Sequence, residues 1–267
     1  MAALTTVNAV VAALPGQRIS VNKPSQTSEG AGTWHSLWKV GGQPAAGASP
    51  AAIAAGGAIP TRATVGALPI ANAATAPLNL LKAVMSGTVA GSLIVYDRLY
   101  AVSGFSGAVA TLQSITTPPT INRPNGNGDD VEIWGEVYTA MGATAATFTA
   151  LYTDQGGTTG QAATYVMPAN ALTVGQMVPF ALAAGDTGVR ALASLQLSIS
   201  TGTAGDFGLT LLRRIAEIPL NIPNVPIIAD LFGLGKPQIE VDACLALMVQ
   251  CTTTTTGQFL GSFNFGE

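Results

Sequence analysis

Charged residues are scarce in this sequence. They make up only 9% of its 267 residues, against about 25% in ordinary soluble domains, and the mean hydropathy is +0.41. A protein that works alone needs charges to keep its surface solvated and free of large apolar patches. We therefore expect much of the surface to be covered by other copies of the chain or by a partner protein.

Long apolar runs and a basic cluster are also missing. No stretch of about 18 or more consecutive apolar residues occurs, so the sequence does not predict a helical membrane span. The net charge is −3, whereas direct nucleic-acid binding needs a clustered positive face. We expect neither a membrane nor a nucleic-acid partner. The first basic residue is Arg18, so the start does not match a signal peptide and we expect synthesis in a host cytoplasm.

Histidine and cysteine are nearly absent, which narrows the possible chemistry. His35 is the single histidine, and it lies between Trp34 and Trp38 with no catalytic signature beside it. A Ser-His-Asp triad or a Cys-His pair would need this residue. One histidine with Cys244 and Cys251 does not make a usual zinc ligand set. We expect a structural histidine, reduced and buried cysteines, no enzymatic activity, and neither a metal nor another cofactor.

The middle of the chain holds short runs rich in β-branched and aromatic residues. Clusters of Gly, Asn, Asp and Thr separate them, and several alternate between apolar and polar side chains, as in residues 194–200. Such alternation is typical of half-buried antiparallel strands. The sequence therefore predicts an all-β fold, an antiparallel β-sandwich with jelly-roll-like or immunoglobulin-like strand order. The runs are VEIWGEVYT, AATFTALYT, AATYVM, VPFAL, LASLQLSIS and FGLTLLRRI.

Residues 1–90 have a different composition from the rest. Within them, residues 41–77 are too rich in Gly, Pro and Ala to hold regular structure, yet their low charge is not typical of disorder. We expect residues 1–90 to form an extended N-terminal arm that lies over a neighbouring surface, and residues 91–267 to form the β-sandwich domain. Short helical turns are expected at residues 78–85 and near residues 227–232.

The densest acidic cluster is Asp129, Asp130, Glu132 and Glu136, with Trp134 among them. Paired carboxylates can serve glycoside hydrolysis or bind a calcium ion. We interpret the cluster as a solvated or interface face of a strand. A carbohydrate- or calcium-binding module that uses these residues is the alternative from another functional class.

Charged pairs inside apolar runs are candidates for contacts between subunits. One pair lies within IVYDRLYAV and another follows FGLTLL. A charge in a strand can guard a sheet edge against aggregation or form an ion pair across an interface, and aromatic residues dominate interface energetics. The predicted interface residues are Trp34, Trp38, Asp97, Arg98, Arg213 and Arg214.

Several segments together resemble a known group of proteins. They are IVYDRLYAVSGFSG, GDDVEIWGEVYTAMGATAATFTALYTDQGG, AGDTGVR, GTAGDFGLTLLRRIAEIPL and DACLALMV. These segments are similar to a group of structural proteins of tailed bacteriophages. The resemblance covers residues 90–267 and implies a virion component without enzymatic activity. We expect a capsid decoration or cement protein, whose partners are the major capsid protein and other copies of this chain in a homo-oligomer. A tail, neck or fibre-associated protein is the alternative.

Overall fold

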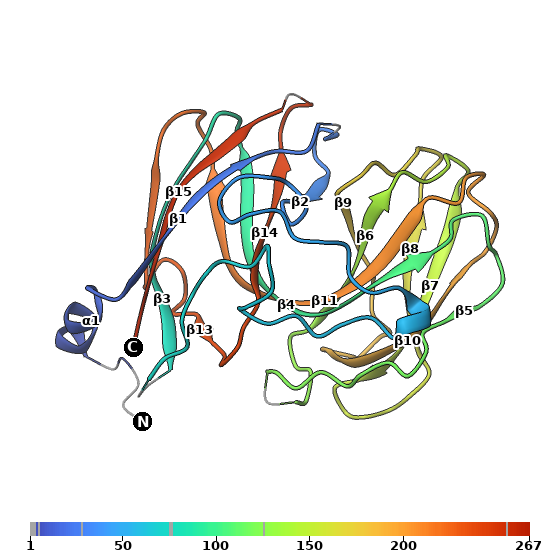
Figure 1. The fold of residues 1–267 in the computed structure, drawn as a ribbon, viewed down its shortest axis with the longest axis horizontal. Coiled ribbons are helices and arrows are strands. Elements are labelled where there is room, and N and C mark those ends of the chain that lie inside the picture. The colour runs from blue at the N-terminus through green and yellow to red at the C-terminus, as the bar shows by residue number, and fades with distance from the viewer. Residues whose placement is uncertain (1–3, 5, 28, 75–76, 125, 255) are drawn as a thin grey trace. The chain divides into compact units, whose positions relative to one another are not determined.

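The computed structural model describes residues 4, 6–27, 29–74, 77–124, 126–254 and 256–267. Its regular structure is almost entirely β-strand (Figure 1), and the strand pairings are antiparallel, so the predicted all-β class is confirmed. The chain divides into two compact units. Unit 1 comprises Met1–Ala48, Thr61–Asp97 and Arg214–Glu267, and unit 2 comprises Ser49–Pro60 and Arg98–Arg213.

Unit 1 is a sandwich of two antiparallel layers around one apolar core. The strands are β1 (Gln17–Pro24), β2 (Trp34–Ser36), β3 (Leu78–Gly87), β4 (Gly91–Phe105), β11 (Asp206–Leu220), β12 (Ile227–Asp230), β13 (Gln238–Ile239), β14 (Leu245–Cys251) and β15 (Gln258–Gly266). One layer has the order β1-β15-β3-β12 with β13 beside β3, and the other joins β2, β14 and parts of β4 and β11. Met85, Val95, Leu247 and Phe263 contribute to the core.

Unit 2 also has two layers, and it contains the remaining parts of β4 and β11. Its own strands are β5 (Gln113–Ser114), β6 (Glu132–Thr139), β7 (Ala146–Asp154), β8 (Gln161–Met167), β9 (Gln176–Pro179) and β10 (Val189–Leu197), with a short 3₁₀ turn η1 (Ile53–Ala55). One layer has the order β5-β10-β7-β8, and the other joins β9, β6 and the remaining parts of β11 and β4. Phe148, Leu195, Ile133 and Phe207 meet in its core.

The six runs predicted as strands correspond to β6, β7, β8, β9, β10 and β11. In β7 the side chains of Phe148, Ala150 and Tyr152 are buried while the alternate positions are half-buried, as the sequence alternation predicts. This agreement follows because the two-residue side-chain period of a strand is a local property of the backbone.

The helical turns predicted at residues 78–85 and 227–232 are wrong, because the structure has β3 and β12 there. Leu78–Gly87 forms a ten-residue strand that is buried at most positions. A short apolar run of this kind cannot be assigned to helix or strand by periodicity alone. Pairing with β15 on one side and β12 on the other decides the conformation. The observed helix is α1 (Val7–Ala13), which Thr6 caps.

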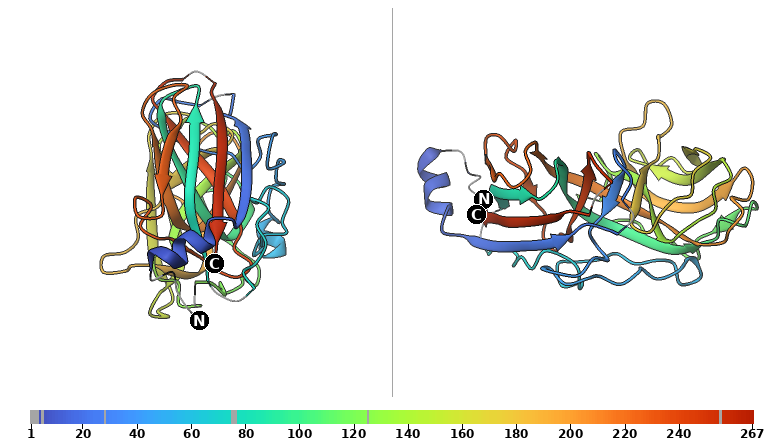
Figure 2. Two further views of the ribbon diagram at one scale, coloured as in Figure 1. Left: turned by 90° about the vertical axis from the view of Figure 1, so that its left-hand side faces the viewer. Right: turned by 90° about the horizontal axis from the view of Figure 1, so that it is seen from above.

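Residues 1–90 contain β1, β2 and β3, and all three belong to unit 1. The boundaries between the units therefore differ from the division expected at residue 90. The physical reason is that β1 pairs along its whole length with β15, the last strand of the chain. These two strands run side by side in both views of Figure 2.

Gly208 of β11 provides a test of this packing. A Cβ at this position would lie 2.4 Å from the carbonyl oxygen of Val102 and 2.5 Å from the ring of Tyr138. Because the backbone carbonyl cannot move away cheaply, we expect Gly208→Ala to lower the free energy of unfolding by about 1–3 kcal/mol in urea titrations.

The matched control is Gly41→Ala, because nothing lies within 4 Å of a Cβ at that position. This variant should stay within about 0.5 kcal/mol of the wild-type protein. An equal effect of both substitutions would contradict the strand packing described here.

Candidate functional site

Asp97 and Arg98, a charged pair predicted at a subunit interface, are both enclosed by this chain. Their exposed fractions are 0% and 1%, and adjacent side chains in a strand point to opposite faces. In unit 1 the Asp97 carboxylate accepts a hydrogen bond of 2.8 Å from the backbone N–H of Cys244. Arg98 belongs to unit 2. The two charged side chains therefore have their partners in different units.

Arg98 forms a buried ion pair with Glu136 in unit 2. Arg98 Nη2 lies 2.7 Å from Glu136 Oε2, and both side chains are 1% exposed. The same carboxylate oxygen accepts hydrogen bonds from the Tyr138 hydroxyl at 2.7 Å and from the Thr210 hydroxyl at 3.2 Å. Burial, and then the adjacent Glu136, raise the pKa of Tyr138 well above its ordinary value. Internal partners thus compensate the buried charge, as a low-dielectric interior requires.

For Glu136 the predicted solvated or interface face is wrong. The strand β6 is buried on both faces from Ile133 to Tyr138, so the carboxylate points into the protein. A signal for this burial exists in the sequence. Glu136 shares its strand face with Trp134 and Tyr138, two large aromatic side chains that are usually buried to a high degree.

The residues of the alternative binding module do not form a common site. Trp134 is 1% exposed, and its indole N–H donates to Glu132 at 2.6 Å, so its ring cannot stack on a sugar. Asp129 and Asp130 are exposed on a loop, where the Asp129 carboxylate accepts from the side chain of Asn127. In the part of the chain that the structure describes, no group of three or more His, Cys, Asp or Glu residues could hold a metal ion.

His35 is 1% exposed in unit 1 and contacts a hydroxyl. Its Nε2 lies 2.9 Å from Thr33 Oγ1, and that hydroxyl donates to the carbonyl of Gly30 at 2.6 Å. The imidazole Nε2–H is therefore the donor to Thr33, and the second ring nitrogen carries no proton. Burial lowers the pKa of His35 to about 4. This geometry makes the histidine structural, as the sequence predicts.

Both cysteines are free and buried, as predicted. The Cys251 thiol lies 3.3 Å from a carboxylate oxygen of Glu29. Burial, and then the charge of Glu29, raise the pKa of Cys251 to about 12. Burial likewise raises the pKa of Glu29. A thiol in this state is a poor nucleophile, because the thiolate is the reactive form.

The other predicted interface residues differ in exposure. Trp38 is 3% exposed and donates its indole N–H to the Ala48 carbonyl at 2.8 Å, so it anchors its own chain. Trp34 and Arg213 are half-buried and Arg214 is exposed. Of the six predicted residues, these three are the ones that reach the surface.

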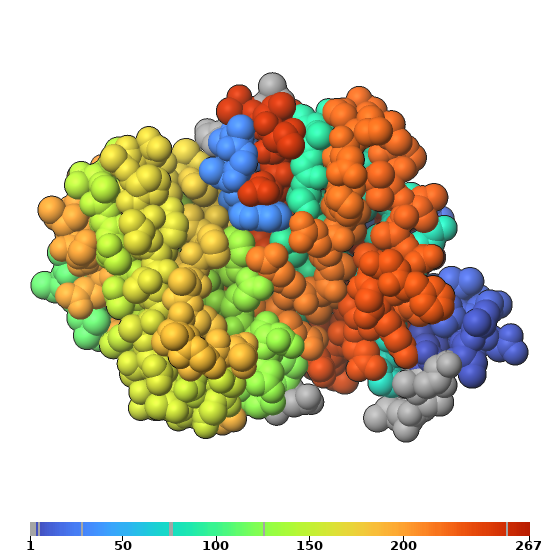
Figure 3. Space-filling model, turned by 180° about the vertical axis from the view of Figure 1, so that it is seen from behind, coloured from blue at the N-terminus to red at the C-terminus, as the bar shows by residue number. Residues whose placement is uncertain are grey.

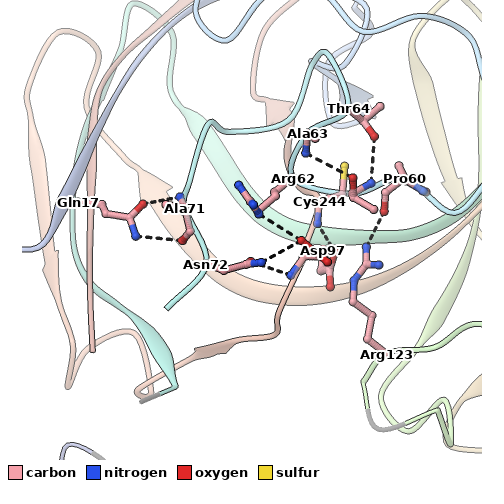
Figure 4. Close-up of polar contacts among 12 residues, drawn as sticks. Gln17, Pro60, Arg62, Ala63, Thr64, Ala71, Asn72, Asp97, Arg123 and Cys244 are labelled. Atoms are coloured by element: carbon pink, nitrogen blue, oxygen red, sulfur yellow. Dashed lines mark hydrogen bonds and ion pairs between the residues drawn. The ribbon is translucent and has the colours of Figure 1, made fainter. Parts of the chain in front are cut away.

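Residues 61–72, which we call the strap, are part of the Gly/Pro/Ala-rich segment and lie along unit 1 (Figure 4). Gln17 and Ala71 exchange two hydrogen bonds of 3.0 and 2.6 Å. Asp242 accepts from Arg62 at 3.1 Å and from Asn72 at 3.0 Å. This part of the predicted arm is thus fastened to its own unit by polar side chains that no sequence motif marks.

The outer face of the β7–β8 ladder in unit 2, which we call the threonine face, carries no charge. Cross-strand neighbours on it are Thr147 with Val166, and Thr149 with Thr164. Leu151 continues the face, and Val166 is 72% exposed. The sequence has no charged residue between Asp154 and Asp186 or between Glu136 and Asp154. The face is therefore an uncharged sheet surface made mainly of β-branched side chains.

No protein-family model matches the chain, and no curated protein matches it. A structure of infectious bursal disease virus Gt strain is 11% identical, with 94% of this chain and 80% of that chain covered and a TM-score of 0.19. The VP2 subviral particle of infectious bursal disease virus is 16% identical, with 69% and 40% covered and a TM-score of 0.19. TM-scores this low do not indicate a shared fold. Over the described residues, the structure has no helix with the length and apolar character of a membrane span.

The buried ion pair predicts a large loss of stability on truncation. Glu136→Ala leaves the Arg98 guanidinium without its carboxylate, so we expect the free energy of unfolding to fall by about 3–5 kcal/mol. The matched control is Arg62→Ala, which breaks an ion pair whose side chains are 37% and 53% exposed and should cost at most about 1 kcal/mol. Equal losses in urea titrations would contradict a buried role for Glu136.

The lowered pKa of His35 predicts a loss of stability in acid. The unfolded chain binds the proton near pH 6.5, whereas the folded chain binds it only near pH 4. Stability should therefore fall as the pH drops from 6.5 to 4, by up to about 3 kcal/mol. The measurement is the free energy of unfolding from urea titrations at pH 7 and pH 5. The difference between the two pH values should be smaller in His35→Gln than in the wild-type protein.

Glu29 acts in the opposite direction, because its folded pKa is raised and its contribution to stability grows as the pH falls. Glu29→Gln should therefore make the acid loss steeper. If the stability of His35→Gln depended on pH as the wild-type stability does, the loss in acid could not be assigned to His35.

Proposed function

We propose that this chain is a structural component of a tailed-bacteriophage particle, and that it decorates the assembled head by binding the major capsid protein. The resemblance of residues 90–267 to tailed-bacteriophage structural proteins and the charged fraction of 9% support this proposal. The observation that carries it is the threonine face of unit 2, an uncharged sheet face.

An uncharged sheet face suits docking onto another protein surface. No ion has to be desolvated when it is covered, and this desolvation is the main cost of burying charged groups. The threonine and valine side chains are β-branched and hold few rotamers, so little side-chain entropy is lost. Burial of their methyl groups contributes about 25 cal/mol per Å² before the entropic cost of association, and the hydroxyls supply directional hydrogen bonds.

The internal use of reactive groups supports a structural role over an enzymatic one. His35 contacts Thr33, and the Cys251 thiol contacts Glu29, each inside unit 1. Glu136 is neutralised by Arg98 inside unit 2. A catalytic acid or base must reach a substrate, and these side chains are each at most 4% exposed.

The position in the particle distinguishes the proposal from its alternative, a tail, neck or fibre-associated protein. Quantitative mass spectrometry of purified particles gives the copy number of this chain relative to the major capsid protein. Hundreds of copies would support a place on the head, and about a dozen or fewer would move it to the neck or tail. Absence from the particles would refute the virion role.

Charge placed on the threonine face should weaken binding to particles that lack this protein. We expect Val166→Glu to bind at least about tenfold more weakly, equivalent to about 1.4 kcal/mol, because the carboxylate would be buried without a partner. The control is Val65→Glu in unit 1, since Val65 is similarly exposed at 64%. Cosedimentation with the particles measures both. Equal binding of the two variants would count against the threonine face as the docking surface.

A further inference from the structure

The helix α1 carries one polar side chain, the exposed Asn8, and is otherwise apolar. It contains no charged residue, and Val7, Val11 and Leu14 follow one another at the spacing of a single helix face. Their exposed fractions are 71%, 58% and 44%. Neighbouring apolar side chains that are exposed together often mark a surface for interaction with another protein. The outer stripe of α1 is thus a face that a further surface has to cover.

The inner side of α1 holds it against unit 1. Ala9, Val10 and Ala13 pack in one cluster with Leu81 of β3 and Leu231. An isolated helix of seven residues is too short to be stable in water, so these contacts keep it folded. The helix therefore presents its outer stripe from a defined position on the unit.

An open sheet edge lies beside this helix. Among the residues that the structure describes, β12 is the last strand of its layer and pairs with β3 on one side. Ile228 on this strand is 64% exposed, and Phe232 just beyond it is 76% exposed. The Asp230 carboxylate accepts from the backbone N–H of Phe232 at 3.1 Å and of Gly233 at 2.9 Å. These bonds hold the turn in which Phe232 stays outside the core.

The stripe and the edge belong to one end of unit 1. Leu231, which lies between Ile228 and Phe232 in the chain, packs in the same cluster as α1. In Figure 3 the blue helix lies next to the orange-red surface of this part of the chain. We call this surface the α1–β12 patch and define it by Val7, Val11, Leu14, Ile228 and Phe232.

The chemistry of the patch restricts what can cover it. The carboxylate of Asp230 is engaged by turn amides, and the ammonium of Lys236 donates to the Leu4 carbonyl at 2.7 Å. Lys82 lies opposite Asp230 in the β3–β12 ladder, so the positive charge next to the patch faces a carboxylate. Nucleic acids and anionic lipid headgroups bind mainly through clustered positive charge, which these lysines do not form. The occupant must therefore offer an apolar surface together with a strand edge.

A second copy of the chain offers both. We propose that two copies associate through the α1–β12 patch about a two-fold axis, with β12 of one copy antiparallel to β12 of the other. An open strand edge pairs readily with another edge, and a two-fold interface uses the same surface on both subunits. This inference does not depend on the proposed function in a virus particle.

The area agrees with such an interface. Five large apolar side chains that are 44–76% exposed present roughly 400 Å² of surface, within the range of the largest patch on a typical monomer. A stable interface buries about 800 Å² per partner. The patch supplies the apolar centre of that area, and the β12 backbone beside it supplies hydrogen bonds.

Sedimentation equilibrium of the purified full-length chain tests the proposal without any particle. We expect a dimer at micromolar concentrations, and a dissociation constant at least about 100-fold higher for Val11→Glu and for Phe232→Glu. The matched control is Ile199→Glu in unit 2, whose isoleucine is 52% exposed and which should stay dimeric. Thermal unfolding of each variant confirms that it is folded.

A cysteine on the edge strand gives an independent readout. Ile228→Cys places two thiols near each other across the two-fold axis, so oxidation should link two chains, whereas Val166→Cys should not. A monomeric wild-type protein would overturn the proposal. So would a dimer that neither glutamate substitution weakens, or binding to neutral lipid vesicles in place of self-association. Loss of particle binding by a protein that still dimerises would bear on the proposed function alone.

Discussion

Burial of the 15-residue strand β4, which contributes to both units, constrains the polar groups that it carries. β4 is buried without a break from Leu93 to Ser103, so each polar side chain in it needs a partner inside the protein. The Asp97 carboxylate accepts a hydrogen bond from a backbone N–H, and Arg98 forms an ion pair with Glu136. The Ser103 hydroxyl donates a hydrogen bond of 2.7 Å to a backbone carbonyl. The neighbouring segments are therefore held against β4 by groups that would otherwise be buried without partners.

The same rule governs other titratable groups. Lys23 is 1% exposed and donates to the Val40 carbonyl at 2.6 Å, and its burial lowers the pKa to about 8. His35 and Cys251 are held neutral by burial as well. These titratable side chains thus stabilise loops and strands inside the protein. Few charged side chains remain for the surface. Interactions with partners then depend on shape, apolar area and backbone hydrogen bonds.

The threonine face and the α1–β12 patch are two different solutions to binding without charge. The first is an uncharged sheet face in unit 2, where β-branched side chains repeat across two strands. The second combines a sheet edge with an apolar helix in unit 1. The edge strand is short, follows Pro226 and ends at Asp230, features that limit uncontrolled edge pairing, so the apolar side chains beside it have to supply the specificity. Because both surfaces consist mainly of uncharged side chains, we infer that salt affects their contacts little.

The sequence by itself determined the all-β class, the strands from β6 to β11, and the buried state of Cys244 and Cys251, because side-chain alternation and residue polarity are local properties. Tertiary structure alone decided that residues 78–87 form a strand between β15 and β12. It also decided that Glu136 faces Arg98 and that β1 pairs with the end of the chain. These outcomes depend on partners that are distant in sequence, and a local pattern contains no information about which distant segment will supply them.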